Sequence, residues 1–146
     1  DKALAGLVMG GPLGRFMYKR LDFEFRGIVP FAYSDRSKMQ PAIIAHYKGP
    51  FEHPMQTEIA WIYARELIGS TDFYESLWSQ REVLRDKPTL LLWGMKDPVF
   101  GPAYLKRWQD VFSNAQTQTF PESGHFVQDE VGADLVPPVR DFLQNT

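Results

Sequence analysis

Two side chains with acid–base chemistry follow two predicted strands in the last third of the sequence. Asp97 follows the apolar run of residues 88–93, and His125 follows the predicted strand of residues 116–120. Parallel strands present their carboxyl ends at the same edge of a sheet, so an acid after one strand can meet a histidine after the next. The spacing therefore predicts an acid–base pair formed by Asp97 and His125.

Aspartate and histidine also have structural uses in proteins. Aspartate is a common turn former, but the strand before Asp97 and the histidine after the next strand favour chemistry over a bare turn. His46, inside a predicted helix, and His53, beside a proline, are interpreted as cap or surface residues. No two histidines have the i, i+4 spacing of a zinc site, and with zero cysteines the sequence predicts no metal centre and no disulfide.

The elements that must position the pair form the end of an α/β fold. Residues 90–92 are three consecutive leucines, which is typical of a strand covered on both faces in a parallel sheet. Apolar spacing predicts a helix over residues 102–112. A final helix over residues 134–144 accommodates two prolines in its first turn and is expected to face inward with Val136, Val139, Phe142 and Leu143. The expected order is β-α-β-α.

The first part of the chain reads instead as helices with almost no strand. Proline starts and apolar periodicity predict helices over residues 12–21, from 41 to 48, over 54–69 and over 71–83. Residues 23–33, interrupted by Gly27 and Pro30, are expected to form a short helix or an irregular turn, and residues 3–14 a loose glycine-rich segment. The polar stretch near residue 86 predicts a boundary, with residues 1–86 as a helical lid and residues 87–146 as the sheet-forming part.

Composition excludes several function classes. The chain has 146 residues, 44% of them hydrophobic, and its 16 basic and 18 acidic residues are interspersed, so no basic stripe suits nucleic acid. The apolar stretch of residues 3–9 is too short to span a bilayer and lacks a basic leader, which predicts neither a membrane helix nor a signal peptide. The absence of cysteine is compatible with a cytoplasmic location as well as with export.

Two short sequence motifs carry a family resemblance. Gly94-Met95-Lys96-Asp97-Pro98 and Gly124-His125-Phe126-Val127-Gln128 resemble the end of the α/β-hydrolase fold, and more narrowly its haloalkane dehalogenase and epoxide hydrolase branch. The resemblance covers the whole chain if residues 1–86 are the helical cap of that branch. It implies a hydrolase that acts on a small apolar substrate through a covalent intermediate and needs no cofactor.

The resemblance also implies roles for individual residues. Asp97 would hold His125 in one tautomer, and His125 would activate the water that hydrolyses an ester between a nucleophilic aspartate and the substrate carbon. In a serine esterase of the same fold, His125 would deprotonate the serine instead. No G-x-S-x-G or G-x-D-x-G elbow occurs in the sequence, so the nucleophile is expected outside this chain.

Aromatic side chains supply the candidates for a substrate pocket. Phe100 and Phe126, with Val99, flank the pair and are expected to form the pocket floor. Trp61 or Trp78 could donate an indole N–H to a halide, although tryptophans on helices usually belong to the core. An epoxide hydrolase would need cap tyrosines, for which the candidates are Tyr18, Tyr33, Tyr47, Tyr63 and Tyr74.

A two-stranded parallel sheet poses a physical problem, because both of its edges stay open. The chain begins at Asp1 without an initiator methionine, and we expect a missing N-terminal half of the hydrolase core, on the same or a separate chain. An oligomer of the fragment is the other solution. The fragment alone is expected to be inactive, and a non-catalytic binding module of this fold remains an alternative.

Overall fold

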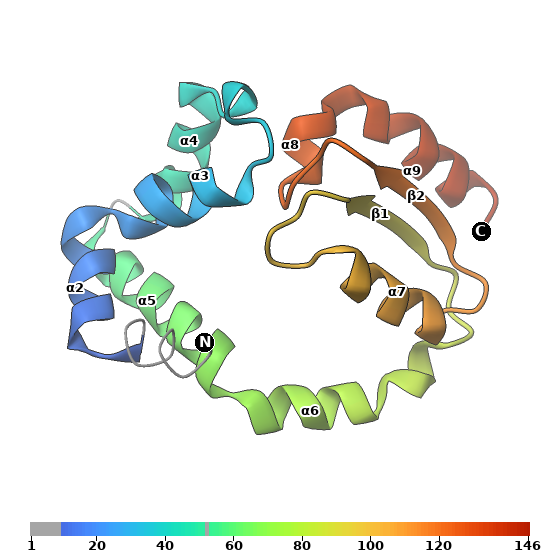
Figure 1. The fold of residues 1–146 in the computed structure, drawn as a ribbon, viewed down its shortest axis with the longest axis horizontal. Coiled ribbons are helices and arrows are strands. Elements are labelled where there is room, and N and C mark those ends of the chain that lie inside the picture. Colours follow the sequence, from blue (N-terminus) through green and yellow to red (C-terminus); the bar gives the residue numbers. More distant parts are fainter. Residues whose placement is uncertain (1–9, 52) are drawn as a thin grey trace. The chain divides into compact units, whose positions relative to one another are not determined.

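The computed structural model describes residues 10–51 and 53–146, and the chain divides into two compact units (Figure 1). One unit contains Asp1–Val29 and Gln40–Ser79, and the other contains Pro30–Met39 and Gln80–Thr146. The division does not follow a single cut, because ten residues from the helical part of the sequence belong to the sheet unit. The apolar stretch of residues 3–9 lies outside the described residues.

Four helices dominate the first unit, as predicted. They are α2 (Pro12–Leu21), α4 (Pro41–Lys48), α5 (Pro54–Gly69) and α6 (Thr71–Ser79). The first three begin with proline, whose missing N–H is not needed in a first helical turn. The fourth was expected to reach residue 83, but it ends at Ser79, and a 3₁₀ turn over Arg81–Leu84 follows.

The core of the first unit lies where α2 packs on α5. Tyr18, Ala60 and Trp61 are buried there, with Phe23 and Phe51 packed against them. The same two helices are joined at their surface by Glu58, which accepts hydrogen bonds from Arg15 at 2.7 Å and from Lys19 at 2.6 Å. The pKa of the Glu58 carboxyl is lowered, chiefly by the hydrogen bond from the Arg15 guanidinium.

A change of helix type connects α2 to the next segment. Asp22 has a left-handed backbone with φ of 50°, and a π-helix over Glu24–Ile28 then runs into α3 (Val29–Ala32). Gly27 and Pro30 had suggested a short helix or an irregular turn here. The structure has a short helix, which is π-helical over Glu24–Ile28 and α-helical over Val29–Ala32. Lys48 pairs with the Asp22 carboxylate at 2.5 Å and fixes this bend.

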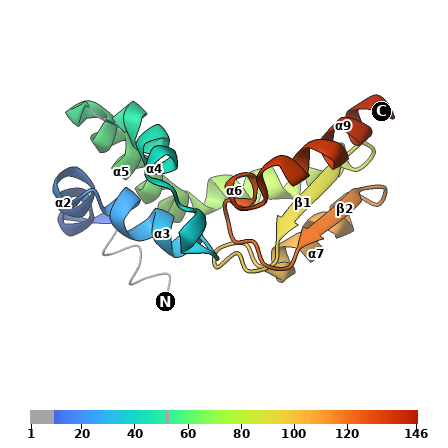
Figure 2. The same ribbon diagram turned by 90° about the horizontal axis from the view of Figure 1, so that it is seen from above.

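The second unit is built on the predicted β-α-β arrangement. Strands β1 (Leu90–Gly94) and β2 (Gln116–Phe120) are parallel, with Leu90 opposite Gln116 and Gly94 opposite Phe120. Helix α7 (Pro102–Val111) connects them. Figures 1 and 2 show the two strands lying between α7 and α9 (Val136–Gln144). Within the described ranges the sheet has these two strands alone, so both of its outer edges are unpaired.

The end of the chain differs in part from the sequence prediction. A helix α8 (Val127–Val131) and a 3₁₀ turn over Gly132–Leu135 precede α9, where one helix over residues 134–144 was expected. Val136, Val139 and Leu143 of α9 were expected to face inward, but Val136 is 60% and Leu143 is 69% exposed. The prediction is wrong for these three side chains, which line an open apolar groove on α9, whereas Phe142 is half-buried.

Candidate active site

The turn after β1 is bonded to the end of β2. The Met95 N–H donates to the carbonyl of Phe120 at 3.0 Å, and the Lys96 N–H donates to the carbonyl of Ser123 at 2.9 Å. The parallel pairing thus continues past the strands. It brings the loop that follows β2 against the loop that follows β1.

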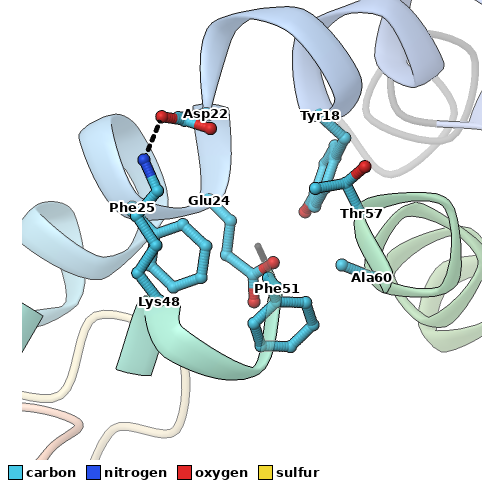
Figure 3. Close-up of a pocket in the computed structure, with 8 residues that line it drawn as sticks. All are labelled: Tyr18, Asp22, Glu24, Phe25, Lys48, Phe51, Thr57 and Ala60. Carbon is cyan, nitrogen blue, oxygen red and sulfur yellow. Dashed lines mark hydrogen bonds and ion pairs between the residues drawn. The ribbon is translucent and has the colours of Figure 1, made fainter. Parts of the chain in front are cut away.

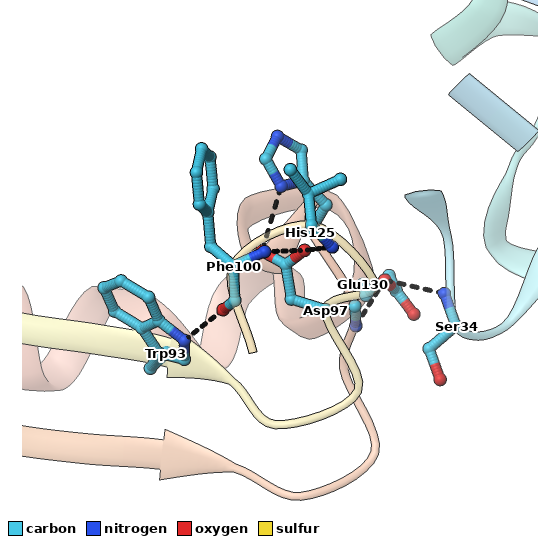
Figure 4. Close-up of polar contacts among 8 residues, drawn as sticks. Ser34, Trp93, Asp97, Phe100, His125 and Glu130 are labelled. Carbon is cyan, nitrogen blue, oxygen red and sulfur yellow. Dashed lines mark hydrogen bonds and ion pairs between the residues drawn. The ribbon is translucent and has the colours of Figure 1, made fainter. Parts of the chain in front are cut away.

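Asp97 lies on this turn with both carboxylate oxygens engaged. Its Oδ1 accepts the backbone N–H groups of Val99 at 2.7 Å and Phe100 at 2.9 Å, while Oδ2 lies 2.9 Å from Nδ1 of His125 (Figure 4). The Asp97 side chain is 9% exposed. The two backbone N–H groups therefore hold the Asp97 carboxylate in an orientation that directs Oδ2 to His125.

The hydrogen bond between Asp97 and His125 fixes the histidine tautomer. An ionised carboxylate can only accept, so Nδ1 of His125 carries the proton and donates it to Oδ2. In the neutral ring Nε2 is then a free base for a proton from another group. The His125 side chain is 33% exposed, against 9% for its partner. This is the arrangement of a general base supported by an acid.

Two glycines allow the two loops to approach each other. A Cβ atom at Gly94 would lie 2.1 Å from the carbonyl oxygen of Gly124, and one at Gly124 would lie 2.5 Å from the carbonyl oxygen of Ala32. No side chain fits at either position without displacing backbone. The His125 N–H also donates to the Ala32 carbonyl at 3.0 Å, so residues 30–39 support the histidine loop directly.

Glu130 also connects the histidine loop to residues 30–39. Its Oε1 accepts the N–H groups of Gly124 at 2.8 Å and Ser34 at 3.2 Å (Figure 4). Its Oε2 accepts the N–H of Asp35 at 3.0 Å. The Glu130 residue is 4% exposed. A buried carboxylate that accepts three backbone N–H groups is a strong anchor. No sequence pattern pointed to Glu130, which in the sequence is only an acid five residues after the histidine.

Tyr33 adds a second connection that sequence reasoning did not find. Its hydroxyl donates to Asp129 at 2.7 Å, and its ring stacks on Phe126 at a centroid distance of 5.0 Å. Lys38 donates to the backbone carbonyl of Glu130 at 2.5 Å. Tyr33 was a candidate proton donor for an epoxide, but here its hydroxyl is directed to a carboxylate in its own unit.

The aromatic rings of Phe100 and Phe126, the residues predicted for a pocket floor, flank the histidine. The ring of Phe100 lies 5.6 Å from the His125 ring, and that of Phe126 lies 5.3 Å away at nearly a right angle. Trp93 is half-buried and donates its indole N–H to the Phe100 carbonyl at 2.8 Å. Apolar walls beside a supported base can hold an apolar substrate.

A family model described as alpha/beta hydrolase fold matches residues 14–131. The chain belongs to the alpha/beta hydrolase fold family. The fold class and the resemblance predicted from the sequence are confirmed, because similar proteins include haloalkane dehalogenases in both the sequence and the structure comparison. Within this family, the described order of strand, acid, strand and histidine is the expected one.

The chain aligns with only part of the length of each similar protein. Haloalkane dehalogenase 2 of Mycobacterium tuberculosis is 27% identical over 127 residues, which are 84% of this chain and 43% of that protein. Cis-3-alkyl-4-alkyloxetan-2-one decarboxylase of Shewanella oneidensis is 29% identical over 59 residues, 40% of this chain and 19% of that protein. The structure of a haloalkane dehalogenase DbeA loop variant from Bradyrhizobium elkanii matches with a TM-score of 0.79 at 17% identity, over 94% of this chain and 47% of that one. The chain spans less than half the length of each.

The two candidate halide donors belong to the first unit of the chain. Trp61 is 8% exposed and lies in the core, with the guanidinium groups of Arg65 and Arg15 at 5.1 Å and 5.7 Å from its ring. Trp78 is half-buried near the end of α6. The surroundings of Trp61 are those of a core residue.

Among the described residues no three His, Cys, Asp or Glu side chains are placed to hold a metal ion together. In the same part of the chain, no helix has the length and hydropathy to cross a bilayer.

Proposed function

We propose that this chain supplies the acid and the histidine of a haloalkane dehalogenase-like hydrolase, with Asp97 orienting His125 as the general base. The 2.9 Å hydrogen bond between Asp97 Oδ2 and His125 Nδ1, at the carboxyl ends of neighbouring parallel strands, carries the proposal. The substrate is a small apolar molecule with a leaving group, and no cofactor takes part.

The reaction proceeds in two steps. A nucleophilic carboxylate displaces the leaving group from the substrate carbon and forms an ester, and His125 Nε2 then takes a proton from water. That water attacks the ester carbonyl, which releases the alcohol and restores the carboxylate. Asp97 stabilises the imidazolium that forms when His125 is protonated. Phe100 and Phe126 bound the apolar side of this space.

The nucleophile lies outside the chain in this proposal. The sequence has no nucleophile elbow, the chain spans less than half of the compared proteins, and both outer edges of its described sheet are unpaired. Strands from the missing N-terminal half of the core would pair those edges, and the first unit would act as the lid over the substrate. The isolated chain should therefore have no hydrolase activity.

Halide release by the protein that carries this chain together with its nucleophile tests the proposal. His125→Gln should abolish steady-state release of halide from 1-bromobutane, since the ester is no longer hydrolysed. His46→Gln is the matched control, because His46 is exposed on α4. Full turnover by His125→Gln, or by the isolated chain, would contradict the proposal.

The decarboxylase relative gives a second candidate. The name of that protein specifies an oxetan-2-one, which is a strained lactone. The match over 59 residues therefore favours a strained lactone as an alternative electrophile for the same acid–histidine pair. Epoxides and aryl esters are the other substrates of this fold to compare. Product analysis separates them, since a decarboxylase releases carbon dioxide and an alkene, and a dehalogenase releases halide and an alcohol. A non-catalytic module would turn over none of them.

A further inference from the structure

The first unit contains a cavity that is open to solvent, since its lining residues Tyr63 and Leu67 are largely exposed, and that the hydrolase proposal does not use. Its volume is about 530 Å³, within the range of small-molecule sites. Four aromatic residues, Tyr18, Phe51, Tyr63 and Tyr74, contribute to its lining. A small chamber of about 10 Å³, shown in Figure 3, shares Tyr18, Glu24, Phe51 and Ala60 with it.

Glu24 places a carboxyl group in this apolar surrounding. Its Oε2 is buried and has no hydrogen-bond partner within the described part of the chain. In Figure 3 the Glu24 carboxyl and the Tyr18 hydroxyl point toward the same space. Burial raises the pKa of Glu24, and burial with the nearby Glu24 charge raises the pKa of Tyr18 to about 12. An unpaired buried carboxyl destabilises the fold, so its presence indicates a partner.

The local backbone also sets Glu24 apart. Glu24 is the first residue of the π-helix and follows the left-handed Asp22. π-Helical turns are rare and occur often at functional sites. The bend therefore holds the carboxyl in the cavity wall instead of at the surface of an α-helix.

The charges around the cavity are negative or already paired. The described residues that line the larger cavity include Glu24 and Glu66 but no lysine, arginine or histidine. Lys48, which lines only the small chamber, is bound to Asp22, as Figure 3 shows. Glu66 is bound to Arg65 and to the Ser70 hydroxyl, at 2.8 Å. Glu24 is thus the carboxyl available to a cation.

We propose that this cavity binds an organic cation, with a primary or substituted ammonium group on the Glu24 carboxylate and its apolar part among the aromatic rings. A carboxylate supplies a charge-assisted hydrogen bond, and aromatic faces attract ammonium groups through their negative quadrupole. The Tyr18 hydroxyl is a second polar contact. Neutral molecules of the same size lack the charge interaction, and anions are repelled by Glu24.

Calorimetric titration of the full-length protein with three probes of equal chain length tests this site. Hexylammonium should bind at least about tenfold more tightly than 1-hexanol, and hexanoate should bind most weakly. Glu24→Gln should remove most of the preference for hexylammonium while leaving 1-hexanol binding within about twofold. Glu75→Gln, which changes an exposed carboxyl on α6 outside the cavity lining, should change neither affinity.

A second variant guards against a folding defect in Glu24→Gln. Tyr74→Leu removes one aromatic face and should weaken hexylammonium more than 1-hexanol. Equal binding of hexylammonium and 1-hexanol, tighter binding of hexanoate, or no binding because other residues of the protein fill the cavity would each overturn the proposal. The hydrolase assay with His125→Gln is independent of all these outcomes.

Discussion

Replacement of Glu130 by glutamine should disconnect the histidine loop from the segment beneath it. Oε1 accepts two backbone N–H groups, from Gly124 and Ser34, and Oε2 accepts one from Asp35. A glutamine amide has one oxygen and one NH₂ group, so in either orientation the NH₂ faces at least one N–H donor. At least one hydrogen bond is lost, and the others lose their charge.

The expected loss of stability follows from these contacts. A hydrogen bond to a charged group contributes about 1.5–3 kcal/mol, and a buried unpaired N–H costs about 1–3 kcal/mol. We therefore expect Glu130→Gln to lower the free energy of unfolding by about 2–4 kcal/mol. If Glu130→Gln lowers the free energy of local opening by about 2 kcal/mol, the backbone amides of Gly124, Ser34 and Asp35 should exchange their hydrogens about 30-fold faster.

Chemical denaturation and amide hydrogen exchange of the full-length protein measure both effects. Asp134→Asn is the matched control, because Asp134 is an exposed acid in the 3₁₀ turn after α8, and it should change stability by less than about 0.5 kcal/mol. In Glu130→Gln the His125 ring nitrogens should also shift in NMR spectra, since the loop that orients the ring is released. Equal stability and exchange in the two variants would refute the anchoring role of Glu130.

Three other substitutions give distinct outcomes. Asp97→Asn should reduce the hydrolysis rate by about 10³–10⁴-fold with little change in the unfolding midpoint, and retained activity would remove Asp97 from the proposed mechanism. Gly124→Ala should destabilise the protein by about 3 kcal/mol or more in denaturation, because the new Cβ meets the Ala32 carbonyl, whereas Gly69→Ala has open space and should be neutral or stabilising. Glu24→Gln should raise stability at pH 7 but not below about pH 4. The raised pKa of Glu24 makes the wild-type protein lose stability as pH rises above the ordinary value of 4.5, and a stability difference that does not change with pH would contradict this sign.

Local rules were sufficient for most elements of the fold. The helices that begin at Pro12, Pro41, Pro54 and Pro102 start where proline suits a first turn, and β2 has the predicted bounds. The π-helix at Glu24 and the short α8 were not predicted. Both depend on tertiary contacts, and neither leaves a periodic apolar pattern that a sequence window can detect.

The candidate site could be predicted only in its central pair. Asp97 and His125 follow successive strands, and parallel pairing brings them together without any further information. The Glu130 carboxylate binds the backbone N–H groups of Ser34 and Asp35, which precede it by 96 and 95 residues, and no local pattern specifies such a contact. Residues 30–39 therefore looked like part of the helical region, although they pack on the histidine loop.

Intact-mass spectrometry of the His125→Gln protein after incubation with 1-bromobutane tests the central claim most directly. If His125 hydrolyses an ester formed on a nucleophilic carboxylate, the full-length variant should accumulate one covalent butyl group and release one equivalent of bromide. The same adduct should be absent from the wild-type protein at steady state. A variant that stays unmodified and continues to turn over substrate would contradict the account.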